Sequence, residues 1–150
     1  MSINSASDTA NVIEVIQHEH QEIEALLARV ADPDNSTRSA AFEELALHLA
    51  KHEAAEQAVV RPEMAKIDNT EGEIREAEEA KADAMLEQLR SMDADSAEFN
   101  TLFDKFRSAV LSHAQHEEAE EHPKLEANLN AGRLEDMGNK FVQAEADAKQ

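Results

Sequence analysis

The chain has 150 residues, enough for one domain with a genuine core, and its lack of cysteine excludes disulfides, thiolate metal sites and cysteine nucleophiles. Its 33 acidic and 14 basic side chains give a net charge of −19, which would repel phosphate backbones and anionic lipid. We therefore expect neither a nucleic acid nor a membrane as a partner, and an acidic surface that either stays solvated or binds cations.

The N-terminal segment carries no sign of a targeting sequence. Residues 1–15 lack the basic and apolar regions of a signal peptide, and no apolar run in the chain reaches membrane-spanning length. The sequence therefore predicts a soluble, cytoplasmic protein.

Few glycines and prolines, three of each, together with abundant Ala, Glu, Leu and Lys indicate a helical protein. Polar breaks at 32–36, 68–72, 93–96 and 128–132 divide the chain into four long helices and a short tail. In chain order, we expect helices from residue 8 to 30, from 36 to about 66, from the second break to about 92, from the third break to about 127, and from 133 onward.

Short breaks between long helices favour antiparallel neighbours. We therefore expect an all-α, up-down-up-down four-helix bundle over residues 8–127. A flexible N-terminus over 1–7 precedes it, and a loop with a short tail helix over 128–150 follows it. The second and fourth helices of such a bundle run parallel to each other.

Capping residues and prolines mark particular points along these helices. Ser36 is placed to cap the second helix, and Asp95 with Glu98 has the spacing of a capping box at the start of the fourth. Pro62 and Pro123 each remove a backbone hydrogen bond to the residue four positions earlier. We expect each proline to kink or end its helix.

The second and fourth helices repeat one pattern, a His followed by Glu after four residues and by Pro after ten. The two copies consist of His52, Glu56 and Pro62, and of His113, Glu117 and Pro123. The four-residue spacing puts His and Glu on one helix face, one turn apart. Parallel helices bring the two copies to comparable depths in the bundle.

The core-facing stripe of each helix is apolar along most of its length but polar at one level. The polar members are His20, the pair His52 and Glu56, Glu79, and the pair His113 and Glu117. A buried unpaired carboxylate loses several kcal/mol or shifts its pKa upward. A metal centre removes this conflict, because His nitrogens and carboxylate oxygens suit iron, manganese or zinc. The two pairs, with single donors from the other helices, can enclose two cations bridged by Glu56 and Glu117.

The remaining histidines give weaker signals. His18 lies two residues from His20 and so faces elsewhere, at the surface. His48 and His116 lie one turn from His52 and His113, where each could line the site or fill a vacant metal position. His122 is expected to be exposed, and the acidic run over 117–122 to form a solvated face.

At these residues the sequence resembles the hemerythrin-like (HHE cation-binding) domain family, over residues 12–127. The family takes one metal-binding His from the first helix, His and Glu four residues apart from the second, one His from the third, and His and Glu again from the fourth. The resemblance thus implies that the metal ligands include His20, His52, Glu56, His113 and Glu117.

The third helix departs from the family pattern, because no His occurs between His52 and His113. Glu79 stands where the following apolar residues match the offsets found after His20, so we interpret it as a carboxylate substitute. Otherwise the position is empty or is filled by water, His48 or His116.

Together these features predict a non-haem dimetal protein that binds or reacts with O2, peroxide or NO. Two iron ions are expected, with manganese or zinc as alternatives; if the protein is an enzyme, the activity is peroxidase-like, catalase-like or oxidase. A carboxylate in place of His favours the ferric state or manganese, and hence turnover over reversible binding. The lack of Tyr and Trp argues against a tyrosyl radical.

Two other functions are compatible with the sequence. One is an oxygen-, iron- or redox-sensing or metal-storage module without turnover, and the other is a metal-free bundle that acts as an interaction module. A small diatomic or peroxide ligand is the expected partner, and the protein is expected to be a monomer or a weak homo-oligomer.

Overall fold

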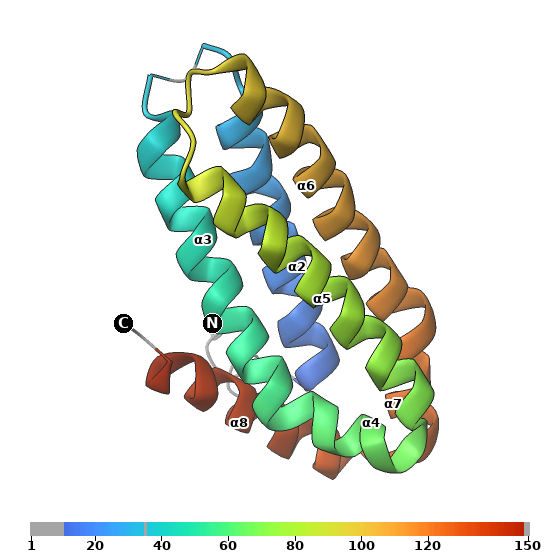
Figure 1. Cartoon of the computed structure of the whole chain (residues 1–150). Coiled ribbons are helices and arrows are strands. Elements are labelled where there is room, and N and C mark those ends of the chain that lie inside the picture. Colours follow the sequence, from blue (N-terminus) through green and yellow to red (C-terminus); the bar gives the residue numbers. More distant parts are fainter. Residues whose placement is uncertain (1–10, 35, 149–150) are drawn as a thin grey trace.

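The computed structural model describes residues 11–34 and 36–148, whose regular structure is entirely helical (Figure 1). The α-helices are α2 (Val12–Ala31), α3 (Arg38–Ala55), α4 (Arg61–Ile67), α5 (Asn69–Arg90), α6 (Ala97–His116), α7 (His122–Asn128) and α8 (Ala131–Asp147). Two π-helical turns, η1 (Glu56–Val60) and η2 (Glu117–Glu121), join α3 to α4 and α6 to α7. The predicted all-α four-helix bundle with a C-terminal helix is confirmed. Within these residues, no helix is both long and apolar enough to cross a membrane.

Both predicted proline breaks take the form of a π turn. The backbone N–H of Arg61 donates to the carbonyl of Glu56, and that of His122 to the carbonyl of Glu117, each five residues back. The proline that follows each of these residues lies in the first turn of the next helix, where a missing N–H is tolerated. Each of the two helices therefore changes from α to π hydrogen bonding for one turn and continues as an α-helix beyond the proline.

Several predicted helix ends are corrected by the observed caps. Helix α2 begins at Val12, after a capping box between Asn11 and Glu14, and the start expected at residue 8 lies outside the described residues, as does the flexible segment 1–7. Helix α5 ends at Arg90 rather than near residue 92, and α8 begins at Ala131 rather than at 133, with the Asn130 side chain accepting from the Arg133 N–H.

The second and fourth long helices each begin one residue later than predicted. Thr37 replaces Ser36 as the N-cap of α3, because its carbonyl accepts the first helical hydrogen bond, from Ala41. Ser96 replaces Asp95 as the N-cap of α6 and accepts from the Phe99 N–H. The backbone N–H of Asp95 instead donates to the Asp93 side chain, which places Asp95 in the preceding turn.

The hydrophobic core consists of two clusters. One lies among α2, α3, α5 and α6 and contains Phe42, Phe99, Phe103 and Phe106. The other is built from the start of α2, the end of α3, the π turn η1, α4, α7 and α8. Helix α8 lies across the end of the bundle near α4 and α7 (Figure 1) and buries Leu134, Met137 and Phe141 in the second cluster. The tail helix is thus an integral part of the core.

Truncating Phe141 should test the contribution of α8 to folding. Its ring is fully buried and meets the His52 ring edge-on, with 5.7 Å between ring centroids. We expect Phe141→Ala to lower the free energy of unfolding of the metal-free protein by about 3 kcal/mol. Val142→Ala is the control, because Val142 is 53% exposed and such changes stay within about 0.5 kcal/mol. Equal denaturation midpoints for the two variants would show that α8 adds no stability.

Candidate metal centre

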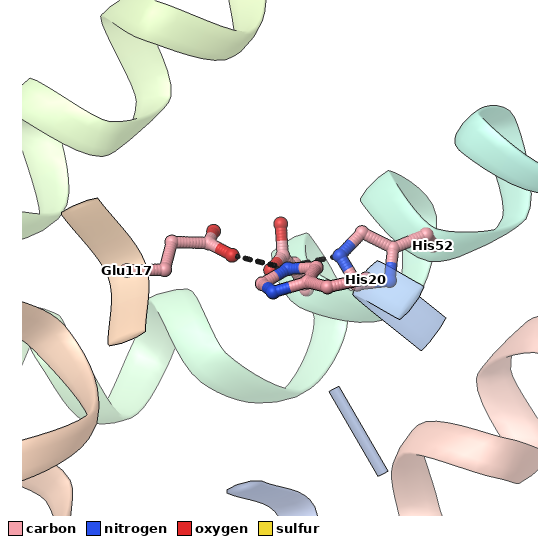
Figure 2. A group of neighbouring side chains, drawn as sticks. His20, His52 and Glu117 are labelled. Atoms are coloured by element: carbon pink, nitrogen blue, oxygen red, sulfur yellow. Dashed lines mark ion pairs between the residues drawn. The ribbon is translucent and has the colours of Figure 1, made fainter. Parts of the chain in front are cut away.

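Six polar side chains gather where the two apolar clusters meet. They are His20 of α2, His52 of α3, Glu56 of η1, Glu79 of α5, His113 of α6 and Glu117 of η2. Figure 2 shows His20, His52 and Glu117 pointing toward one another. These are the six residues that the sequence predicted for the site, and the structure brings all of them together.

The six residues form two overlapping groups. In each group, one ligand atom per residue lies within 4.8 Å of the others. The first group is His20, His52, Glu56 and Glu117, and the second is Glu56, Glu79, His113 and Glu117. Glu56 and Glu117 belong to both groups, so each can contribute to two adjacent cation positions.

Each of the three histidines directs its Nε2 atom toward the shared carboxylates. His20 Nε2 lies 3.0 Å from Glu117 Oε1, and His52 Nε2 lies 3.2 Å from Glu56 Oε2. His113 Nε2 lies 3.1 Å from Glu117 Oε2 and 3.3 Å from Glu79 Oε2. The three Nε2 atoms are therefore the imidazole donors available to a cation at the centre.

The opposite nitrogen, Nδ1, of each of these histidines meets an outer carboxylate. The distances are 2.7 Å from His20 Nδ1 to Glu118, 2.7 Å from His52 Nδ1 to Glu19, and 2.8 Å from His113 Nδ1 to Glu78. A carboxylate that accepts from Nδ1–H leaves Nε2 as the free lone pair and fixes the ring orientation, the arrangement typical of metal-bound histidine.

Sequence reasoning missed these three outer carboxylates. Each comes from a different helical segment than the histidine it contacts, so helical spacing could not reveal the pairing. A signal was nevertheless present, since Glu19, Glu78 and Glu118 are the chain neighbours of His20, Glu79 and Glu117.

Five buried carboxylate oxygens at the centre need a partner. Both oxygens of Glu56, both of Glu117 and Oε1 of Glu79 have no hydrogen-bond partner among the described residues. The His Nε2 atoms lie 3.0–3.2 Å from three of these oxygens and form ion pairs with them while the imidazoles are protonated. Buried polar atoms left without a partner cost about 1–3 kcal/mol each, and more when charged. Oxygen and imidazole donors of this kind fit divalent cations.

The π turns determine where the two shared carboxylates lie. Glu56 and Glu117 are the first residues of η1 and η2. A π turn widens the helix locally and is common at functional sites. Both shared carboxylates thus come from the two places where the bundle departs from regular α-helix.

Comparison with known proteins agrees with this geometry. The family model for the hemerythrin HHE cation-binding domain matches residues 11–125. The chain belongs to the hemerythrin HHE cation-binding domain family. The structure of this HHE domain is similar to the crystal structure of a hemerythrin HHE cation-binding domain-containing protein from Mycobacterium kansasii, with a TM-score of 0.84 over 93% of this chain and 87% of that one. The two chains are 21% identical, so this likeness concerns the fold alone. Comparison with curated proteins gives no significant match.

On the third long helix of this HHE domain, Glu79 of α5 lies at the centre. Burial raises the pKa of Glu79 to about 7, and the neighbouring Glu56 carboxylate adds to the rise, while contacts with His113 and Arg61 oppose it. A carboxyl group in such an acidic setting is held more easily as an anion when a cation is bound beside it.

Protons and cations compete for the centre of this HHE domain. Burial lowers the pKa of His113, but its contacts with Glu117 and Glu79 outweigh this effect and raise the pKa to about 11. Burial likewise raises the pKa of Glu117, but His113 and His20 hold it well below the usual value. Charged imidazoles thus neutralise the carboxylates, and cations must displace their protons.

The predictions for the other histidines have mixed outcomes. His18 is at the surface as predicted, with its side chain 71% exposed and 3.5 Å from Glu22. His116 places Nδ1 2.6 Å from Glu78, and half-buried His48 lines a separate cleft of about 160 Å³. The structure therefore brings Glu79 rather than His48 or His116 into the central group.

The prediction that His122 is exposed is wrong. His122 is 2% exposed and stacks on His20, with 6.4 Å between ring centroids and 10° between the ring planes. The acidic run is solvated only in part, because Glu118 and Glu120 are exposed while Glu117 and Glu121 are buried. The reason is the π turn, which turns the residue five positions after Glu117 inward instead of outward.

A small cavity adjoins the centre of this HHE domain. It has a volume of about 30 Å³ and is lined by His20, His52, Glu79 and His113 together with apolar side chains that include Leu49 and Val110. This volume exceeds the roughly 10–15 Å³ that a cavity needs to hold one water molecule. The cavity therefore leaves room only for a very small molecule beside the metal-capable donors.

Proposed function

We propose that this HHE domain is a dimetal protein, with two iron ions, that binds or reacts with O2, peroxide or NO. One observation carries the proposal, namely two groups of buried donors that share Glu56 and Glu117. In this assignment Glu56 and Glu117 would be ligands of both ions, His20 and His52 would complete one site, and His113 and Glu79 would complete the other.

The charges of the donor set favour two divalent cations over one. Three carboxylates contribute three negative charges, so a single dication leaves the centre negative and two dications leave it slightly positive. Nitrogen and oxygen donors without sulfur suit iron, manganese or zinc. Two iron ions supply redox chemistry that allows two electrons to pass to or from a small molecule.

The protein itself orients the histidine ligands and restricts which molecules reach the centre. The carboxylates on Nδ1 hold the three imidazoles with Nε2 toward the centre, and the small cavity limits what can approach. The third-helix carboxylate Glu79 adds negative charge, which stabilises the higher oxidation state of a bound ion and supports turnover over reversible binding.

Metal analysis of the protein expressed with iron and then desalted tests the proposal. We expect close to two ions per chain and near-ultraviolet and visible absorption that changes with peroxide and with reductant. Well under one ion per chain would reject the dimetal centre. Stoichiometric zinc with no visible absorption would reject iron.

A sensing module without turnover is the second function, and the position of α8 favours it. Phe141 of α8 contacts the His52 ring, and a carboxylate oxygen of Glu145 of α8 lies within 4.8 Å of ligand atoms of His52 and of its partner Glu19. A change in bonding at His52 would therefore reach the C-terminal helix. Peroxide consumption by the metal-loaded protein separates the two functions, because loss of many equivalents per chain excludes a pure sensor.

Replacing Glu79 by alanine should remove only one of the two ions. Glu79 belongs to the group that contains His113 and is absent from the group that contains His20 and His52. We expect elemental analysis of Glu79→Ala to give about one ion per chain under conditions that load two into the wild type. Glu76→Ala, an exposed position on the same helix, should keep both. Full loading of Glu79→Ala would exclude Glu79 as a ligand.

A further inference from the structure

Arg61 is a buried cation next to the centre that the ligand assignment does not use. It lies five residues after Glu56, at the end of the π turn η1 and directly before Pro62. Its side chain is only 12% exposed. Because its backbone N–H closes the π hydrogen bond to Glu56, the turn that places Glu56 at the centre also brings Arg61 to the same face of the column.

The guanidinium of Arg61 joins two acidic side chains from different helical segments. Nη2 donates to Oε2 of Glu79 at 3.0 Å, and Nη1 donates to Oε2 of Glu121 at 3.1 Å. The planar guanidinium presents its donors in a rigid fork, so it holds both partners in a defined orientation. Glu121 is fully buried, which makes it a rigid anchor for the other end of this contact.

The contact with Arg61 orders the two oxygens of Glu79. Oε2 faces Arg61 and also lies 3.3 Å from His113 Nε2, whereas Oε1 has no hydrogen-bond partner in the described part of the chain. A glutamate side chain has several rotatable bonds and many conformations available to it. Arg61 restricts that freedom by holding one oxygen and leaving the other free.

Arg61 also offsets part of the negative charge of Glu79, since its single positive charge is shared between Glu79 and Glu121. A carboxylate on the third long helix adds one negative charge to a centre that already contains Glu56 and Glu117. A guanidinium in contact with that carboxylate supplies one positive charge at the same place, in a setting where burial strengthens the interaction.

We propose that Arg61 is a positioning residue that holds Glu79 in place as the third-helix ligand, so that the second cation site depends on the Arg61–Glu79 pair. The inference rests on the proposed dimetal function. Arg61 itself touches neither cation; it acts through the carboxylate that it orients.

Zinc titration of the metal-free, full-length protein tests this role. Calorimetry on the wild type should show two ions bound. In Arg61→Gln, we expect the site with His20 and His52 to keep its affinity, while the other loses roughly 10- to 100-fold, the usual effect of removing a partner of a metal ligand. Arg61→Lys keeps the charge but not the fork, and should recover part of the lost affinity.

A double variant separates positioning from a general structural effect. If Arg61 acts through Glu79, adding Arg61→Gln to Glu79→Ala causes no further loss at the remaining site. Unchanged binding of both ions in Arg61→Gln, equal loss of both ions, or an additive loss in the double variant would each overturn the inference. A wild type that binds fewer than two ions would instead contradict the proposed function.

Folding of the variants is checked by circular dichroism and thermal unfolding. Arg61→Gln leaves Glu121 buried without its cationic partner, which can destabilise the fold. If that variant does not fold, the double variant Arg61→Gln with Glu121→Gln removes both charges together. The zinc titration is then performed on this double variant. Glu121→Gln alone should still bind two ions, because Arg61 keeps its contact with Glu79.

Discussion

Replacing Glu117 by alanine should remove both metal ions in a single step. Glu117 belongs to both donor groups, and its two oxygens face His20 Nε2 and His113 Nε2. Without it, each site loses a ligand and the two cations lose a shared anion between them. We expect elemental analysis to find well below one ion per chain, and visible absorption to be absent.

Glu120→Ala is the matched control for this experiment. Glu120 lies in the same π turn but is exposed and belongs to neither donor group. It should bind as much metal as the wild type. Retention of one ion by Glu117→Ala would show that the carboxylate belongs to a single site, and retention of two would remove the basis for a shared centre.

Removing the metal should lower the thermal stability of the protein by a large amount. A cation that binds only the folded state adds about 4 kcal/mol when its free concentration is 1,000 times its Kd. For a domain of this size, each kcal/mol shifts Tm by about 2–4 °C. The metal-loaded protein should therefore unfold on the order of 10 °C above the chelated protein, as measured by circular dichroism or calorimetry.

His52→Ala should reduce this difference between the loaded and the chelated protein without abolishing it, because the second donor group does not contain His52. His52 is buried and supplies Nε2 to the first donor group, whereas His18 is largely exposed and lies outside both groups. His18→Ala should keep the full metal-dependent shift. The alternative of a metal-free interaction module predicts no shift in the wild type, and a His52→Ala variant that is unchanged or more stable because a buried polar group is gone.

The long helices and the metal-capable level could be predicted from local pattern alone. The apolar stripe of each helix repeats at three- and four-residue steps, and the positions where it turns polar occur once per helix. His52 with Glu56 and His113 with Glu117 share a face by spacing, and a core position for a carboxylate already implies a compensating charge. Because these features are local, they can be recognised in the sequence without knowing which helices contact each other.

The wrong prediction that His122 is exposed comes from a π turn, whereas the shifted helix ends come from the caps. A periodicity of 3.6 residues places His122 on the outside, but the turn from Glu117 to Glu121 contains one residue more than an α turn and rotates everything after it. The same change brings Arg61 against Glu79, a contact that no α-helical projection would suggest. Pro62 and Pro123 indicated that the helices are irregular at these points, but they did not indicate that the irregularity is a π turn.

The amino-acid sequence by itself determined the all-α architecture, the family resemblance and the six polar residues at one level, because each depends on helical periodicity or on a motif within one helix. Only the tertiary structure decided which carboxylate meets which imidazole, since Glu19, Glu78 and Glu118 each reach a histidine of another segment. It also decided that α8 packs into the second apolar cluster and that Arg61 contacts Glu79. Such pairings depend on how helices distant in sequence pack, and hydrophobic spacing along one helix carries no information about them.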